Sequence, residues 1–176
     1  MKSAFLTHVA CNCRYSNGRG HAPNNPMPRW LRVGTFLIGK VFATELNARH
    51  LNYYFTSDAG LRLHSDDESF FCDSPRILSL SLGATRDIIF EPRDNAPSTC
   101  KPHFRKTLGH GSLNSMSGAI QNYYRHGVLA AGAGIGVRIN ITWRQIVRNN
   151  CGLDGVFVAT PAAQERDESG PLRFVS

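Results

Sequence analysis

Short runs of β-type sequence make up most of the chain after residue 47, and Gly, Pro, Asn and Asp separate them. Apolar and polar residues alternate along several runs, which is typical of strands with one buried face. Short strands at this spacing favour a sandwich or jelly roll over a parallel sheet with crossover helices. The predicted strands are His50 to Phe55, Arg62 to His64, Arg76 to Leu82, Asp87 to Phe90, Phe104 to Leu108, Ser112 to Met116, Tyr123 to His126 and Val137 to Trp143.

One amphipathic helix is predicted before these strands. The apolar residues Trp30, Val33, Leu37 and Val41 recur at helical spacing, and Pro28 stands where the first turn of a helix tolerates proline. Residues 1–28 read as a short extended segment or hairpin followed by an irregular loop, and residues 29–148 as the core. Residues 149–176 turn polar and are expected to be a partly disordered tail.

The length of 176 residues suits one domain that can bury a core without disulfides or structural zinc. No apolar run approaches the roughly 18 residues that span a bilayer, and Thr7 and His8 interrupt the apolar start, which makes it a poor signal peptide. We therefore expect a monomer without a membrane segment.

The five cysteines are odd in number and scattered, which argues against a disulfide framework and for a reducing compartment. We accordingly expect an intracellular protein, either cytoplasmic or nuclear. Cys11 and Cys13 could begin a zinc site, but no second Cys or His pair stands at finger-like spacing.

The formal net charge of +7, with a pI near 9.5, indicates a polyanionic partner such as nucleic acid. Many basic soluble proteins bind no nucleic acid, so charge alone leaves the partner open.

A candidate metal site begins at His64, which stands two positions before Asp66 in a predicted strand, so that both side chains leave the same face. His126, after the aromatic stretch that ends at Tyr124, is our choice for a third ligand. Two imidazoles and one carboxylate leave coordination positions open for substrate and oxygen on a redox metal. The alternative is an ordinary hydrogen-bonded or surface His-x-Asp pair. Of the other histidines, we expect His8, His21, His50 and His103 at the surface and His110 in a turn.

A candidate anion site follows in the last predicted strand, where Arg138, Asn140, Thr142 and Arg144 alternate with apolar residues and share one face. An arginine suits a carboxylate ligand because its planar fork can grip both oxygens, which a lysine cannot. The alternative is a pair of exposed strand arginines.

Five motifs follow one another along the chain: His64-Ser65-Asp66-Asp67-Glu68, Leu78 to Asp87, His110-Gly111-Ser112-Leu113, His126 and Arg138-x-Asn140-x-Thr142-x-Arg144. Together, in this order and spacing, they resemble the AlkB family of Fe(II)- and 2-oxoglutarate-dependent dioxygenases, over about residues 6–147. The nucleic-acid repair branch of that family carries the same Asp-Asp-Glu sequence. The resemblance implies a mainly β fold, a double-stranded β-helix (jelly roll) with one or two flanking helices.

The resemblance also implies roles for individual residues. Iron ligands would be His64, Asp66 and His126; contacts to 2-oxoglutarate would come from Asn52, Tyr54, Arg138, Asn140 and Arg144, with Arg144 also supporting Asp66 in catalysis. Glu68 would read the exocyclic amine of a damaged base, and Arg14 and Tyr15 would belong to a substrate lid. Ordinary readings remain beside these: Tyr54 as a core aromatic, Glu68 as a solvated acid and Tyr15 as a loop aromatic. Trp143 departs from the family, which usually has Phe there.

The implied function is oxidative demethylation of N-alkylated bases, such as 1-methyladenine and 3-methylcytosine, in DNA or RNA, with Fe(II), 2-oxoglutarate and O2. One alternative is a protein or small-molecule hydroxylase with the same iron site. Another is a catalytically silent module that binds nucleic acid or protein.

Overall fold

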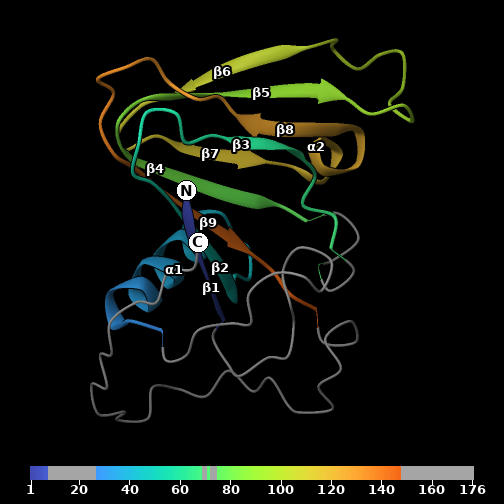
Figure 1. Cartoon of the computed structure of the whole chain (residues 1–176). Coiled ribbons are helices and arrows are strands. Elements are labelled where there is room, and N and C mark those ends of the chain that lie inside the picture. Colours follow the sequence, from blue (N-terminus) through green and yellow to red (C-terminus); the bar gives the residue numbers. More distant parts are fainter. Residues whose placement is uncertain (8–26, 69–70, 72–74, 148–176) are drawn as a thin grey trace.

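The computed structural model describes residues 1–7, 27–68, 71 and 75–147. Two helices and nine strands are assigned within these ranges (Figure 1). In chain order they are β1 (Lys2–Thr7), α1 (Arg29–Val41), β2 (Ala48–Tyr54), β3 (Leu61–His64), β4 (Ile77–Gly83), β5 (Arg86–Pro92), β6 (Phe104–Leu108), β7 (Leu113–Met116), α2 (Gly118–Tyr123), β8 (Tyr124–Val128) and β9 (Arg138–Arg144).

The strands form two antiparallel sheets. The larger sheet has the order β1-β2-β9-β4-β7, and the smaller has the order β3-β8-β5-β6. Apolar residues of both sheets meet between them, where Ile77 and Met116 of the larger sheet pack with Ile88, Phe90 and Leu108 of the smaller one. This arrangement confirms the predicted mainly β jelly roll with flanking helices.

All eight predicted strands are present, with ends that differ from the prediction by at most two residues. The extended start of the chain is β1, which pairs with β2. The sequence pattern did not predict α2 as a helix. The predicted lid residues Arg14 and Tyr15 and the predicted tail of residues 149–176 lie outside the described residues, so the proposed division into three segments stays a prediction.

Helix α1 confirms the predicted helix. The side of the helix that is buried is not the side that carries the apolar residues used to predict it. Pro28 is the residue that precedes the helix, and Leu31 and Thr35 face the sheet. The four residues that revealed the helical spacing are exposed, with Trp30 at 57% and Leu37 at 56%. Periodicity identifies an amphipathic helix, but tertiary packing decides which side meets the sheet. Within the described residues, neither helix has the length and apolar character needed to cross a bilayer.

The hydroxyl of Thr35 joins α1 to the larger sheet. It donates to Leu31 O at 2.7 Å and accepts from Arg49 Nε at 2.6 Å and from Trp143 Nε1 at 2.9 Å. Burial lowers the pKa of Arg49 to about 9, so this guanidinium remains charged at neutral pH. The indole N–H of Trp143 has the Thr35 hydroxyl as its hydrogen-bond partner. A phenylalanine at this position would have no N–H and could not make that bond.

The two faces of the larger sheet carry different chemistry. The outer face packs its apolar residues against α1, and Leu51, Leu78, Ile141 and Trp143 belong to this cluster with Leu31. The inner face is polar, because the alternate residues of the same strands point into the barrel. These inner residues include Asn52, Ser79, Ser81, Arg138, Asn140, Thr142 and Arg144, and all are buried.

Candidate metal and cosubstrate site

Two histidines lie side by side on neighbouring strands of the smaller sheet. His64, the last residue of β3, is the register partner of His126 in β8, and their ring centroids are 4.4 Å apart. His64 Nδ1 lies 2.9 Å from Arg62 O. A proton on Nδ1 can be donated to that carbonyl, which leaves Nε2 with the lone pair that a metal needs. The strand pairing thus presents two imidazoles at one point.

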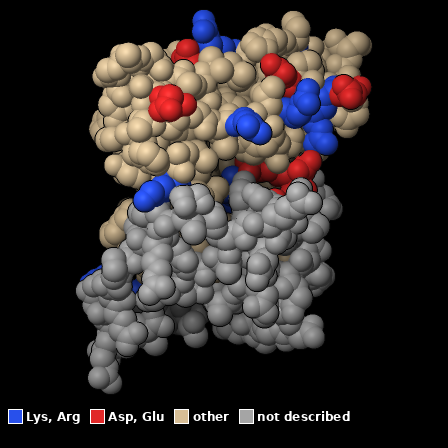
Figure 2. All heavy atoms as spheres, viewed as in Figure 1, with Lys and Arg blue, Asp and Glu red and all other residues tan. Residues whose placement is uncertain are grey.

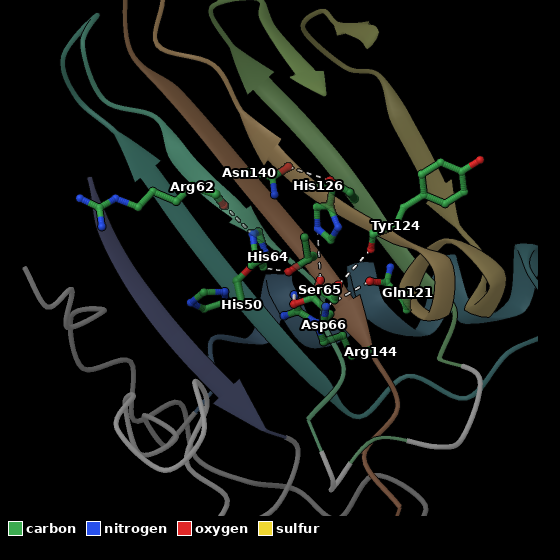
Figure 3. A network of polar contacts seen from close by, with 12 residues as sticks. His50, Arg62, His64, Ser65, Asp66, Gln121, Tyr124, His126, Asn140 and Arg144 are labelled. Carbon is green, nitrogen blue, oxygen red and sulfur yellow. Dashed lines mark hydrogen bonds and ion pairs between the residues drawn. The ribbon is translucent and has the colours of Figure 1, made fainter. Parts of the chain in front are cut away.

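Asp66 completes the group from a position just beyond β3. The sequence suggested that His64 and Asp66 share a strand face, but β3 ends at His64 and a loop places the carboxylate. Asp66 N donates to Gln121 Oε1 at 3.1 Å, which fixes the loop against α2. Asp66 Oδ1 accepts from Arg144 Nη2 at 2.7 Å, and Oδ2 lies 3.6 Å from His126 Nε2 (Figure 3).

The protonation states favour metal binding. Burial would raise the pKa of Asp66, but the positive charge of Arg144 and the neighbouring His126 and His64 outweigh it and hold this pKa well below its usual range. Burial lowers the pKa of His64, an effect that the charge of Asp66 opposes in part. At neutral pH the site therefore offers a carboxylate together with an uncharged His64 imidazole, the forms that bind metals.

The geometry of the three side chains fits one metal ion. One ligand atom from each of His64, Asp66 and His126 lies within 4.8 Å of the other two. Among the described residues, this is the group of His, Cys, Asp and Glu side chains close enough to share an ion. Two nitrogen donors and one oxygen donor suit Fe(II) and leave positions for exogenous ligands.

The strand register brings the predicted anion-binding residues into two rows on the larger sheet. Asn52, Asn140 and Ser81 form one row across β2, β9 and β4, and Tyr54 and Arg138 stand in the next. Gly83 ends the second row with a φ of +90°, and a Cβ there would lie 2.4 Å from Val137 O. The chain turns at this glycine, beside Arg138.

Arg138 retains donors for an anion. Its Nη2 donates to Ser81 Oγ at 2.8 Å and to Asn140 Oδ1 at 3.1 Å. Its Nε and Nη1, like the hydroxyl of Tyr54, are buried and make no hydrogen bond of good geometry, although Tyr54 lies close enough to Arg138 to perturb its pKa. The Tyr54 ring lies against the guanidinium, with Cζ 4.9 Å from the ring centroid. Since unpaired buried donors are costly, a carboxylate that accepted from them would be strongly held.

The remaining predicted residues are Glu68, the lid residues and the histidines outside the metal group, and they differ in burial. Glu68 is half-buried two residues after Asp66, and its carbonyl accepts from Phe71 N at 3.0 Å. Arg14, Tyr15, His8 and His21 lie outside the described residues. The expectation for His50 is wrong, because it is 8% exposed on the inner face of β2. His103 is exposed, and His110 lies in a turn where its Nδ1 accepts from Gly83 N at 2.9 Å.

Sequence reasoning missed three residues that hold the site together. Gln121 is fully buried in α2 and binds the backbone of Asp66, and no local pattern pointed to it. Ser79 and Ser81 contact Asn140 and Arg138 from β4. Their alternation with Leu78, Leu80 and Leu82 was a usable signal, because it places two small polar groups on the inner face.

The profile of the 2OG-Fe(II) oxygenase superfamily matches residues 7–144. Among curated proteins, the alpha-ketoglutarate-dependent dioxygenase alkB homolog 3 of Mus musculus is 32% identical over 131 residues, which are 69% of this chain and 45% of that protein. The DNA oxidative demethylase ALKBH2 of Arabidopsis thaliana is 28% identical over 122 residues, which are 59% of this chain and 39% of that protein. The chain thus spans about half the length of the curated relatives that it matches.

The solved structure of OsALKBH1 superposes with a TM-score of 0.55 at 17% identity, covering 81% of this chain and 77% of that one. This likeness supports the jelly-roll fold. The superfamily profile and the curated relatives show that the chain belongs to the 2OG-Fe(II) oxygenase superfamily and, within it, to the AlkB family.

Proposed function

We propose that this chain is an Fe(II)- and 2-oxoglutarate-dependent dioxygenase that oxidatively demethylates N-alkylated bases, such as 1-methyladenine and 3-methylcytosine, in DNA or RNA. The observation that carries the proposal is that one barrel interior contains both the His64, Asp66 and His126 group, which could hold a metal ion, and the buried guanidinium of Arg138. The superfamily implies Fe(II), 2-oxoglutarate and O2 as the metal and the two cosubstrates.

The side chains of His64, Asp66 and His126 would hold the iron. When bound, Fe(II) supplies the activation of O2 that oxidation of an unactivated methyl group requires. Arg144 orients the Asp66 carboxylate and keeps it ionised, and Gln121 holds the backbone of the same residue. These contacts fix the direction in which the carboxylate faces the two imidazoles.

The cosubstrate would lie between the metal group and Arg138. Arg138 would hold the distal carboxylate of 2-oxoglutarate with its unpaired donors, and the Tyr54 hydroxyl would donate to the same anion. Asn140 is held by Ser79 and Arg138, so its amide has a fixed orientation. Asn52 stands opposite Asn140 on β2 and would contact the ligand from the other side.

The proposed reaction balances in atoms. One oxygen atom of O2 enters the new carboxylate of succinate as 2-oxoglutarate loses CO2, and the other enters a C–H bond of the N-methyl group. The resulting hydroxymethyl amine breaks its C–N bond, which releases formaldehyde and returns a proton to the base nitrogen.

A nucleic-acid substrate is supported by several features. Some relatives bear the name DNA oxidative demethylase, and the net charge of +7 favours a polyanion. On the face shown in Figure 2, the described Lys and Arg residues are interspersed with Asp and Glu. Non-specific attraction of phosphates to that face is therefore limited, and selectivity would come from residues near the metal group. Glu68 near Asp66 could accept from the exocyclic nitrogen of a flipped base, and Arg14 and Tyr15 would cover it.

The test measures formaldehyde released from oligonucleotides that contain 1-methyladenine or 3-methylcytosine, together with succinate formed with and without the oligonucleotide. We expect formaldehyde and extra succinate in equal amounts, and oligonucleotide affinity that falls with salt whatever the sequence. Glu68→Ala and Tyr15→Ala should reduce formaldehyde release more than succinate formation, whereas Glu45→Ala, at an exposed loop position, should reduce neither.

Two results would reject the proposal in favour of its rivals. Succinate formation without repair of any methylated oligonucleotide would favour a protein or small-molecule hydroxylase. Iron binding without either product would favour a silent binding module.

A further inference from the structure

We propose that Arg86 supplies a second positive charge to the carboxylate end of the 2-oxoglutarate site, and thereby selects 2-oxo acids that carry a distal carboxylate. The inference rests on the proposed function, since it deepens the description of the cosubstrate site. Arg86 lies within the Leu78 to Asp87 motif, but no role was assigned to it from the sequence.

Arg86 lies where the two sheets meet, at the end of the barrel that holds Arg138. It is the first residue of β5 in the smaller sheet and is 2% exposed. Its guanidinium donates to Thr56 O at 3.4 Å and to Gly136 O at 3.3 Å. Thr56 closely follows Tyr54 at the end of β2, and Gly136 closely precedes Arg138 at the start of β9. The guanidinium therefore lies between the chain segments that carry these two cosubstrate-site residues.

The positive charge of Arg86 contributes to the pKa shifts of two residues of the cosubstrate site. The pKa of Arg138 lies below its usual value because the group is buried; Tyr54 opposes this shift and the positive charge of Arg86 adds to it. Burial likewise raises the pKa of Tyr54, while the charges of Arg138 and Arg86 oppose that shift. Arg86 therefore lies within electrostatic range of Tyr54 and Arg138, and its contacts with Thr56 O and Gly136 O place it beside the segments that carry them.

This pair of buried cations lacks an anion within the described part of the chain. Neither Arg86 nor Arg138 forms an ion pair with a described Asp or Glu, and their hydrogen-bond partners are carbonyls, one hydroxyl and one amide. Arg86 Nε and Arg138 Nε and Nη1 have no partner. Two like charges held in a buried site repel each other, and a bound carboxylate would relieve both the repulsion and the unpaired donors.

A purely structural role for Arg86 accounts less well for these observations. Its three bonds to carbonyls, at 3.2 to 3.4 Å, are at or beyond the long end of the usual range for N–H···O bonds. Such bonds do little to offset the cost of burying a charge. A neutral amide side chain could make similar contacts at lower cost, whereas an anionic ligand requires the charge.

The test compares 2-oxoglutarate with 2-oxopentanoate, which has the same chain length and a methyl group in place of the distal carboxylate. Dissociation constants are measured by calorimetry on the anaerobic Fe(II) protein. Arg86→Gln should weaken 2-oxoglutarate binding by at least about tenfold and leave 2-oxopentanoate binding unchanged. Arg86→Lys, which keeps the charge, should retain most of the affinity for 2-oxoglutarate. Arg105→Gln removes an exposed arginine of β6 and should change neither constant.

Equal weakening of both 2-oxo acids by Arg86→Gln and Arg86→Lys would overturn the proposal and show that the residue only holds the loops. An unchanged affinity for 2-oxoglutarate in Arg86→Gln would overturn it as well. Failure of the dioxygenase assignment gives a different result, because the wild-type Fe(II) protein would then not bind 2-oxoglutarate at all. Failure of the nucleic-acid assignment alone would leave these dissociation constants unchanged, since no oligonucleotide takes part in the measurement.

Discussion

Arg144 Nη2 lies 2.7 Å from Asp66 Oδ1, and this ion pair joins the end of β9 in the larger sheet to the loop that follows β3 in the smaller sheet. Both side chains are buried, so the pair experiences little screening by water. One carboxylate oxygen is thereby committed to Arg144, while the other faces His126. The pair thus aims Asp66 at the two histidines and keeps it ionised.

The first prediction concerns the metal ligands. His64→Ala or Asp66→Ala should weaken Fe(II) binding by at least about 100-fold and abolish turnover, because removing a ligand costs more than removing an outer partner. Chelation should inactivate the wild type reversibly. Asp67→Ala is the matched control, since Asp67 is exposed and pairs with Arg93. An iron-replete, active Asp66→Ala protein, measured by equilibrium dialysis and succinate formation, would refute the ligand assignment.

The second prediction concerns the cosubstrate. Arg138→Lys keeps the positive charge but loses the fork, so the 2-oxoglutarate concentration needed for half-maximal turnover should rise by about tenfold or more. Arg125→Lys, at an exposed position of β8, should leave this concentration unchanged. A normal requirement in Arg138→Lys would place the anion site elsewhere. The measurement is succinate formation as a function of 2-oxoglutarate concentration.

The third prediction concerns pH and the metal-free protein. The pKa values of His64 and Asp66 are both lowered on folding, so the unfolded chain binds more protons and the free energy of unfolding rises with pH. The contribution of His64 is complete above its ordinary pKa of 6.5 and is lost as pH falls below it, and that of Asp66 is lost below 3.8.

Urea unfolding of the metal-free protein between pH 7.5 and pH 5 tests this third prediction. Over this range His64→Asn should flatten the dependence of the unfolding free energy on pH. His103→Asn changes an exposed histidine and should leave the dependence as it is in the wild type. Identical slopes in the wild type and His64→Asn would show that His64 does not carry the effect.

The fourth prediction concerns the attachment of α1. Thr35→Val deprives two buried donors, Arg49 Nε and Trp143 Nε1, of their shared acceptor and should lower the free energy of unfolding by about 3 kcal/mol. Trp143→Phe leaves Arg49 paired with Thr35 and should cost less, about 1–2 kcal/mol. Thr35→Ser keeps the hydroxyl and is the control. Equal stability of Thr35→Val and Thr35→Ser in urea unfolding would contradict the described network.

The sequence predicted what depends on local alternation and missed what depends on tertiary contact. The strands were found because period-2 patterns such as Leu78 to Leu82 record which side of a strand is buried. The buried side of α1 was not, because the sheet packs against Leu31 and Thr35 rather than against the more apolar stripe. His50 was misplaced for a similar reason: a histidine carries no sign of burial until its strand is paired on both edges.

The same distinction holds for the residues of the candidate site. The residues in motifs were named from the sequence, since their chemistry and spacing are characteristic. Gln121 lies outside the motifs, and Arg86 lies within the Leu78 to Asp87 motif but was given no role there. Each contacts residues far away in the chain, Gln121 the backbone of Asp66 and Arg86 the segments beside Tyr54 and Arg138. Such pairs become visible once the two sheets are placed face to face.

The central claim is that the His64, Asp66 and His126 group and the Arg138 site bind one iron ion and one 2-oxoglutarate together. The most direct measurement is an anaerobic titration with Fe(II) and then 2-oxoglutarate, followed by visible absorption. We predict a metal-to-ligand charge-transfer band that saturates at one 2-oxoglutarate per bound iron, is absent in Asp66→Ala and needs more 2-oxoglutarate in Arg138→Lys. Binding of 2-oxoglutarate that produces no such band and is equally tight without iron would contradict the account.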